Sequence, residues 1–286
     1  GLFRGLCRSF DVDLVMKVFT VGTDDNLRDF TDAVYPQGSM CLSILLRGKD
    51  IKVNGVRVNS NVRLHAGDEV VYYTKPSQEA LKSHDVVFED ENMLICDKES
   101  GVSSEGLSSE LCESGEYYPC HRLDRNPRGL IVFAKTRASE SEITRAFKDR
   151  RVEKIYSALC KNAFTAKEGT LLAYLTKNER ESSVRISDKP TGSAVKIITR
   201  YEVLRAAGDV AEVKVILHTG KTHQIRAHMA FIGCPVLGDE KYGDVALNRK
   251  YGLKRQQLIA KTLVFDFDGK LSYLNGRKFE SKYDFK

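Results

Sequence analysis

The sequence lacks the features that define several large classes of protein. No apolar run approaches the roughly 20 residues that a membrane-spanning helix requires, so we expect no membrane partner. The chain has no glycine-rich cofactor loop, no internal repeat and no low-complexity segment. Its seven cysteines occur singly, with no Cys-x-x-Cys pair. This pattern argues against disulfides and structural zinc, and for the reducing environment of the cytoplasm.

The remaining composition is that of an ordinary globular protein. The chain has 286 residues, of which 42% are hydrophobic and 29% charged. That is enough to bury the core of one large domain or of two unequal ones. The net charge of +6 suits a nucleic-acid partner without requiring one.

Changes of pattern along the chain predict four segments. The stretch 16–20 is typical of a natural start, so residues 1–15 are expected to be a leader or an added segment. A small α+β domain is predicted over 16–75. A linker with little apolar periodicity follows over 76–84. The larger domain is predicted over 85–286 and opens with two short strands around an acidic turn.

The small domain contains the clearest local signal in the sequence. Asn54-Gly55 lies between two alternating runs, which predicts a two-residue hairpin turn because both positions need positive φ. Lys52 then faces Arg57 on the outer side, where two like charges favour either a bound anion or a solvated surface. The apolar residues predicted to face the buried side are Ile51, Val53, Val56 and Val58. The cations predicted to contact RNA here are Arg47, Lys49, Lys52, Arg57 and Arg63.

This part of the chain resembles the S4 RNA-binding domain. The resemblance rests on helix candidates over 25–35 and 40–46, on the hairpin, and on the closing Ala66-Gly67-Asp68-Glu69-Val70. It implies that the cationic cluster binds RNA. S4 domains usually carry Arg-Leu-Asp near the start of the first helix, where this chain has Asn26-Leu27-Arg28.

The larger domain contains a motif that places one acid among arginines. His121-Arg122-Leu123-Asp124-Arg125 is followed by Arg128 and by an apolar run over 130–134, which predicts a strand buried on both faces. Cationic neighbours favour the ionised form of Asp124 and can also grip a polyanion. Cys120 adjoins the motif and is predicted to be a small buried residue, not a nucleophile.

Two further blocks follow the first motif. A helix is predicted over 139–149 with Ser139 as N-cap, and then a strand over 154–159 with Lys154 and Tyr156 on one face. A strand over 210–217 leads into Thr219-Gly220-Lys221-Thr222-His223-Gln224-Ile225-Arg226.

The third block predicts a helix and no metal site. Thr222 is the predicted N-cap of a helix that ends near Gly233. Its predicted buried stripe is Ile225, Met229 and Ile232. His218, His223 and His228 recur every five residues, a spacing that does not put two ligands on one helical face, so we predict no metal.

In their order and distances the three blocks resemble the motifs of the RluA family of pseudouridine synthases, over roughly residues 85–270. The resemblance implies an α+β fold, with a catalytic domain built on a mixed, mainly antiparallel β-sheet flanked by helices. It also implies a reaction that needs no cofactor. The bond from uracil N1 to the ribose breaks, and the base is rejoined through C5.

The family's site residues carry over to matching positions of this chain. By this resemblance Asp124 is the nucleophile or base, Tyr156 stacks on the uracil and Arg226 holds Asp124. Arg122 would fill the space left by the flipped nucleotide. The expected pocket residues are Ile225, His121 and Leu123. The expected RNA contacts of the larger domain are Arg125, Arg128, Lys221 and His223.

Five residues at three places depart from the family pattern. Glu99 replaces a proline in the opening block, and Lys221 replaces the first arginine of the third. Asn126-Pro127-Arg128 lies where the family has an acidic or amide residue and then Thr-Ser. This loses two hydroxyls that could brace the loop, although Pro127 stiffens it.

Two alternatives come from other classes of protein. One is a non-catalytic RNA-binding protein on the same fold, supported only by the altered loop after Asp124. The other is a hydrolase with paired carboxylates, which needs a second acid near Asp124. The order of an S4-like module before the catalytic domain resembles bacterial enzymes that modify large-subunit ribosomal RNA. We therefore expect a cytoplasmic monomer acting on ribosomal RNA, with transfer RNA as the alternative.

Overall fold

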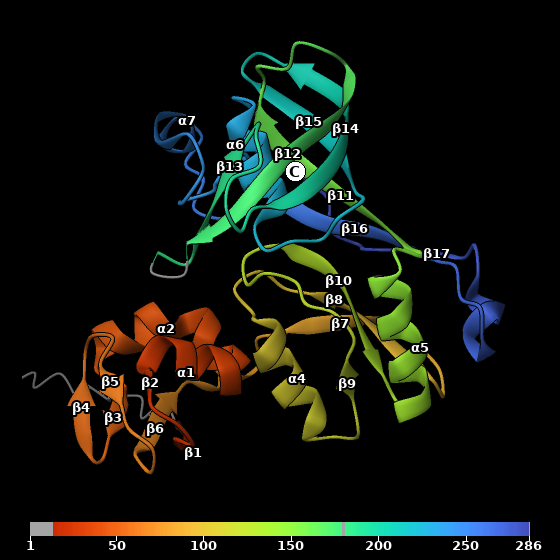
Figure 1. Cartoon of the computed structure of the whole chain (residues 1–286). Helices are drawn as coiled ribbons and strands as arrows, with labels where there is room; N and C mark the ends of the chain where they lie inside the picture. The colour runs from red at the N-terminus through yellow and green to blue at the C-terminus, as the bar shows by residue number, and fades with distance from the viewer. Residues whose placement is uncertain (1–13, 179–180, 286) are drawn as a thin grey trace, which may run out of the picture. The chain divides into compact units, whose positions relative to one another are not determined.

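The computed structural model describes residues 14–178 and 181–285. The expected leader, residues 1–15, lies outside the described residues except for its last two, and so does Cys7. The chain forms two units, Gly1–Ser83 and His84–Lys286 (Figure 1). No helix within the described ranges is long and apolar enough to cross a membrane.

The first unit packs helices against a small antiparallel sheet of order β1-β6-β3-β4, with β2 paired to β5. Its strands are β1 Val15–Thr20, β2 Asp25–Asn26, β3 Ile51–Val53, β4 Val56–Val58, β5 Arg63–Leu64 and β6 Glu69–Thr74. Its helices are α1 Leu27–Val34, α2 Pro36–Gly48 and α3 Pro76–Glu79, the last within the predicted linker. Leu27, Leu45, Ile51 and Tyr72 lie at the centre of its core.

The predicted hairpin forms in the predicted register. Asn54 and Gly55 have φ of 48° and 79°, and Lys52 lies opposite Arg57. The prediction that all four apolar residues face a buried side is wrong for Val56, which is 68% exposed. The reason is that β4 ends the sheet and has a neighbouring strand on one side only.

The second unit is built on one large sheet of order β13-β12-β14-β15-β11-β16-β10-β8-β7. Its strands are β7 His84–Glu89, β8 Met93–Lys98, β9 Tyr118–Pro119, β10 Arg128–Ala134, β11 Val152–Lys161, β12 Glu168–Asn178, β13 Ser183–Ser187, β14 Val195–Ala207, β15 Val210–Leu217, β16 Leu258–Phe265 and β17 Lys278–Glu280. β10 and β16 are parallel, whereas the other neighbours along this path are antiparallel. This confirms the predicted mixed, mainly antiparallel sheet.

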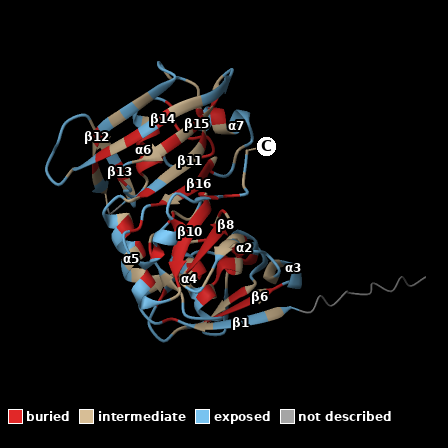
Figure 2. Ribbon diagram, turned by 90° about the vertical axis from the view of Figure 1, so that its right-hand side faces the viewer, coloured by how far each residue is buried: buried red, intermediate tan, exposed pale blue. Residues whose placement is uncertain are grey.

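Helices cover different parts of this sheet. They are α4 Ser104–Cys112, α5 Arg137–Lys148, α6 Gln224–Phe231, α7 Val245–Lys250 and the 3₁₀ helix Lys270–Leu274. α5 packs on β10, whereas α6 packs on β12, β13 and β14 (Figure 1). β10 and β8 are almost wholly buried, as predicted for the apolar run after Asp124 (Figure 2).

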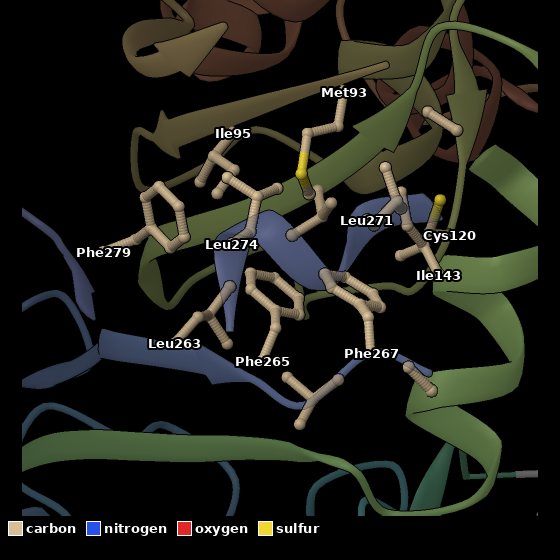
Figure 3. Close-up of a cluster of buried hydrophobic side chains, with 14 of the residues drawn as sticks. Met93, Ile95, Cys120, Ile143, Leu263, Phe265, Phe267, Leu271, Leu274 and Phe279 are labelled. Atoms are coloured by element: carbon tan, nitrogen blue, oxygen red, sulfur yellow. The ribbon is translucent and has the colours of Figure 1, made fainter. Parts of the chain in front are cut away.

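A cluster of apolar side chains fills the space between β10, β16, α5 and the 3₁₀ helix (Figure 3). Phe265 stacks on Phe267 with ring centroids 4.9 Å apart. A second cluster, which includes Ile225 and Met229 of α6, packs on β11 and β15. Both clusters anchor strands that border the candidate site.

The N-caps of two helices differ from the predictions. α5 begins after Thr136, whose side chain exchanges hydrogen bonds with Ser139, so Ser139 is not the N-cap. α6 is preceded by His223 in the left-handed region, with φ of 55°, and not by Thr222. The turn before α6 is closed instead by Gln224, whose Oε1 accepts from the Lys221 amide at 3.1 Å and the Thr219 hydroxyl at 2.9 Å.

Candidate active site

The loop between β9 and β10 carries the predicted catalytic motif and is anchored by its own side chains. His121 Nε2 accepts the backbone N–H of Val132 at 3.0 Å, and the imidazole stacks on Phe147 at 4.3 Å. Burial lowers the pKa of His121 to about 3, so the ring is neutral at physiological pH. Leu123 is buried, and its backbone N–H and C=O both bond the Ser104 hydroxyl of α4, at 2.9 and 2.7 Å.

A fully buried lysine holds the other side of this loop. Lys98 Nζ, at the end of β8, donates to the backbone carbonyls of Glu99, Val102 and Arg125 at 3.0, 2.6 and 2.9 Å. Burial lowers the pKa of Lys98 to about 7, against the opposing charge of Asp124. The backbone is therefore fixed both before and after Asp124. Sequence reasoning did not single out Lys98; a lysine at the end of a buried apolar strand was the available signal.

Asp124 itself projects into a cleft beside the side chains of Arg226 and His223. Its side chain is 29% exposed, and its Oδ2 lies 3.7 Å from Arg226 Nη1 and 3.7 Å from His223 Nε2. His223, predicted as an RNA contact, is thus placed next to the candidate catalytic carboxylate. Burial and the charge of Arg226 lower the pKa of His223, which favours the neutral ring.

Arg226 is held chiefly by Asp239, which the sequence analysis did not include among the site residues. Arg226 Nε and Nη2 donate to the two Asp239 oxygens at 2.6 and 3.0 Å. Asp239 is buried and also accepts the backbone N–H groups of Lys241 and Tyr242. Burial alone would raise the pKa of Asp239, but these bonds outweigh it and leave the pKa below its usual value. The predicted Asp124–Arg226 contact therefore depends on a third residue.

Tyr242 completes the support of this side of the cleft. Its hydroxyl accepts the Val184 N–H at 2.8 Å and lies 3.0 Å from His223 Nδ1. With Val184 occupying a lone pair, the Tyr242 O–H can donate to Nδ1. The proton of His223 then sits on Nε2, facing Asp124. The Tyr242 ring also lies 5.1 Å from the Arg226 guanidinium carbon. The sequence analysis did not include Tyr242 among the site residues.

Tyr156 lies in the same cleft, on β11. It pairs with Val215 of β15 and Ala260 of β16, next to a register shift between Ile155 and Tyr156. Burial, with a smaller contribution from Asp124, raises the pKa of the phenol, which therefore stays protonated at neutral pH. Ile225, one of the expected pocket residues, is buried and also borders the cleft.

The cleft has a volume of about 580 Å³ and a basic lining. This falls within the roughly 300–1,000 Å³ of small-molecule sites. Lys154 lies within it, next to Gly220, where a Cβ would be 2.8 Å from Lys154 Nζ. The other cations that border it are Arg122, Lys148, Arg150, Lys221 and Arg226. Such a lining suits a polyanionic ligand whose reacting part enters the cleft.

The remaining predicted RNA contacts are dispersed. Arg122 is 76% exposed and pairs with Glu105 at 3.0 Å. Arg125 Nε donates to the Gly101 carbonyl, and Arg128 pairs with Glu99. In the first unit the cations are mainly exposed: Arg47, Lys49, Arg57 and Arg63, with Lys52 half-buried.

The hairpin cations have an aromatic neighbour that the sequence analysis did not predict. Lys52 Nζ and the Arg57 guanidinium carbon lie 5.2 and 5.7 Å from the centroid of the Tyr73 ring. Arg57 also donates to the Lys49 carbonyl. These contacts relieve part of the like-charge repulsion across the hairpin.

The histidines and cysteines have separate environments. His228 is buried and bonds Thr199, whereas His218 is exposed at the cleft. Within the described ranges no group of three or more His, Cys, Asp or Glu is arranged to hold a metal ion. Cys120 is buried, and burial raises the pKa of its thiol to about 12, consistent with the prediction that it is not a nucleophile.

Comparison with known proteins identifies the family. The profile of the RNA pseudouridylate synthase family matches residues 69–231. Ribosomal large subunit pseudouridine synthase C of Vibrio cholerae is 30% identical over 250 residues, covering 77% of this chain and 78% of that protein. The Escherichia coli K12 protein of the same name is 30% identical over 265 residues, covering 81% of each.

A solved structure agrees with these sequence matches. Human RNA Pseudouridylate Synthase Domain Containing 1 superposes with a TM-score of 0.56 at 28% identity, covering 65% of this chain and 79% of that one. The resemblance to the RluA-type enzymes is confirmed: the chain belongs to the RNA pseudouridylate synthase family and is an RNA pseudouridine synthase.

Proposed function

We propose that Asp124 acts directly on the target uridine, as the nucleophile or as the base. The observation that carries this proposal is the position of its carboxylate in the cleft, 3.7 Å from both Arg226 and His223 and near enough to Tyr156 for its charge to raise the pKa of that phenol. A carboxylate held near the Arg226 guanidinium on a fixed loop has the geometry that attack or proton abstraction requires.

The proposed roles of the neighbouring residues follow from their environments. Tyr156 is a protonated phenol on a rigid strand, so it can stack on uracil and exchange a proton with it. Ile225 supplies an apolar wall. Arg226, fixed by Asp239, holds Asp124 in its working position.

Arg122 is proposed to enter the space that the target uridine leaves in the RNA. Its side chain is largely exposed, and its pair with Glu105 is of the weak surface kind. Swinging the guanidinium away from Glu105 therefore costs little. A planar guanidinium can then stack between bases and bond phosphates.

We propose ribosomal RNA of the large subunit as the substrate, with transfer RNA as the alternative. The proposal is supported by the names of the Vibrio and Escherichia relatives, which align over most of their lengths. It is also supported by an S4-like first unit whose Arg47, Lys49, Arg57 and Arg63 are exposed. We further propose that the chain works as a cytoplasmic monomer.

The experiment that tests activity and substrate together is pseudouridine mapping with a carbodiimide. Total RNA is compared from cells with the gene, without it, and complemented with wild type or Asp124→Asn. A site that is lost on deletion and restored only by the wild type supports the proposal and names the RNA. Restoration by Asp124→Asn would remove Asp124 from the mechanism, and a site in transfer RNA would overturn the proposed substrate.

A further inference from the structure

A charge pair links the end of the loop that carries Asp124 to the end of β8. Glu99 follows β8 directly, and Arg128 begins β10, the antiparallel neighbour of β8. Arg128 Nε donates to Glu99 Oε1 at 2.5 Å, and the same oxygen accepts the Ser100 N–H at 2.8 Å. Glu99 and Arg128 are also two of the positions where this chain departs from the family motifs. The two substituted residues therefore contact each other in the fold.

Tyr283, close to the C-terminal end of the chain, joins this pair. Its hydroxyl donates to the second oxygen of Glu99 at 3.2 Å, and its ring centroid lies 4.9 Å from the Arg128 guanidinium carbon. Glu99 and Arg128 are therefore bonded to each other and both packed on one phenol.

The segment that carries Tyr283 is itself fixed. The Ser281 hydroxyl and the Lys282 N–H donate to the buried Asp97 carboxylate at 2.7 and 2.8 Å. Lys261 Nζ of β16 donates to the carbonyls of Ser281 and Tyr283 at 2.9 and 2.8 Å. Tyr283 is thus presented from a braced stretch of backbone.

The backbone of the loop between Asp124 and β10 is tied at both of its ends. Its backbone is tied at Arg125, whose carbonyl accepts from Lys98 Nζ and from the Gly101 N–H. It is tied again at Gly129, with φ of 117°, where a Cβ would lie 2.3 Å from the Ala260 carbonyl oxygen of β16. Arg128 is the charged residue between those two ties, and its side chain reaches across to Glu99 at the end of β8.

We propose that Glu99, Arg128 and Tyr283 form a brace that positions Asp124, so that the C-terminal segment serves the active site. The inference rests on the proposed role of Asp124, since it explains how that carboxylate is held. Arg128 then acts in positioning, and its charge is committed to Glu99 and Tyr283, although the sequence analysis expected it to contact RNA.

The test measures the chemical step and the loop separately. Single-turnover tritium release is followed with enzyme in excess over total [5-³H]uridine-labelled RNA from cells lacking the gene, which contains the substrate whichever RNA it is. Arg128→Gln, Glu99→Gln and Tyr283→Phe are compared with Arg200→Gln, the control. Arg200 of β14 is an exposed arginine that pairs with Glu168 of β12 at 3.1 Å.

We expect Arg128→Gln and Glu99→Gln to slow release on the order of tenfold, because small displacements of a reacting group are costly. The Kd for RNA should change less than threefold. The double variant should be no slower than the slower single variant, because both changes remove one contact. Tyr283→Phe, which keeps the ring and loses the hydroxyl, should have a smaller effect, and Arg200→Gln should match wild type. Additive losses, or losses in Kd alone, would overturn the brace.

Hydrogen exchange supplies a readout that does not need activity. The peptide over 121–129 should take up deuterium faster in Arg128→Gln and in Tyr283→Phe than in wild type, at unchanged Tm. Unchanged deuterium uptake by this peptide would contradict the proposed brace, whatever the tritium-release rates. If deuterium uptake rises but neither wild type nor Asp124→Asn releases tritium, the proposed function is wrong. The contact of Arg128 with Glu99 and Tyr283 would still be shown to hold the loop.

Discussion

Arg226 gives its two strongest hydrogen bonds to Asp239, at 2.6 and 3.0 Å, and meets Asp124 only with the remaining Nη1, at 3.7 Å. The guanidinium is thus fixed by one acid and offered to another. Asp239 is fully buried, whereas Asp124 faces the cleft. The pairing leaves the Asp124 carboxylate free of a close hydrogen bond from Arg226, and so available to a substrate.

Removing Asp239 should damage both stability and catalysis. Asp239→Ala leaves the Arg226 charge buried without its main partner, which costs about 3–5 kcal/mol of unfolding free energy. Urea denaturation measures this loss. Asp209→Ala, which breaks the surface pair with Lys250 and the hydrogen bond from the Tyr251 hydroxyl, is the control and should change stability less. Equal effects of the two variants would contradict the assigned role of Asp239.

Asp124→Asn should abolish turnover and leave RNA binding nearly intact. The amide keeps the size of the side chain and removes its charge, so the cleft remains while the reacting group is lost. Tritium release and filter binding on the same RNA check the two halves of this statement. Residual turnover above one percent of wild type would argue that another group does the chemistry.

Acid should weaken the fold through His121. Its folded pKa of about 3 lies below the unfolded value of 6.5, so the unfolded chain binds a proton that the native chain does not. Stability is then fully present above pH 6.5 and falls as pH drops toward 3, by at most about 1.4 kcal/mol per pH unit from this group. Protonation would also cost the Val132 hydrogen bond. His121→Gln should show a shallower pH dependence of urea-unfolding free energy between pH 6.5 and 4, and identical slopes would refute the neutral-histidine assignment.

The hairpin of the first unit should contribute to RNA binding through charge. Substituting Lys52 and Arg57 together by glutamine should weaken binding and reduce the slope of log K against log salt by up to about two. Arg200→Gln with Arg205→Gln, on β14 of the second unit, is the control for a loss of two positive charges. An unchanged slope would mean that the pair over Tyr73 serves the fold alone.

Local patterns were enough to predict the hairpin and the strands that border the site. Asn54-Gly55 allowed positive φ at both positions, and the apolar run over 130–134 had the composition of a strand buried on both faces. Local patterns were not enough for the N-caps. Ser139 and Thr222 each had a plausible capping sequence, but in each case the neighbouring residues bonded differently once the helix was packed.

The site residues likewise fall into those that local motifs identified and those that only the fold revealed. Asp124, Tyr156 and Arg226 were identified from short motifs, and the fold brings all three to one cleft. Asp239, Tyr242 and Lys98 were missed as site residues, because each acts through a contact distant in sequence. Asp239 bonds a residue 13 positions earlier, and Lys98 bonds a carbonyl 27 positions later.

The sequence by itself determined the family, the candidate site residues and the secondary structure of the best-patterned segments, because these depend on residue type and short spacing. Only the tertiary structure decided which charge neutralises which. Arginine has the same side chain at 122, 128 and 226, yet one is exposed, one is braced by Glu99 and Tyr283, and one is locked to Asp239. Electrostatic partnership depends on distance and burial, and both are properties of the packed chain.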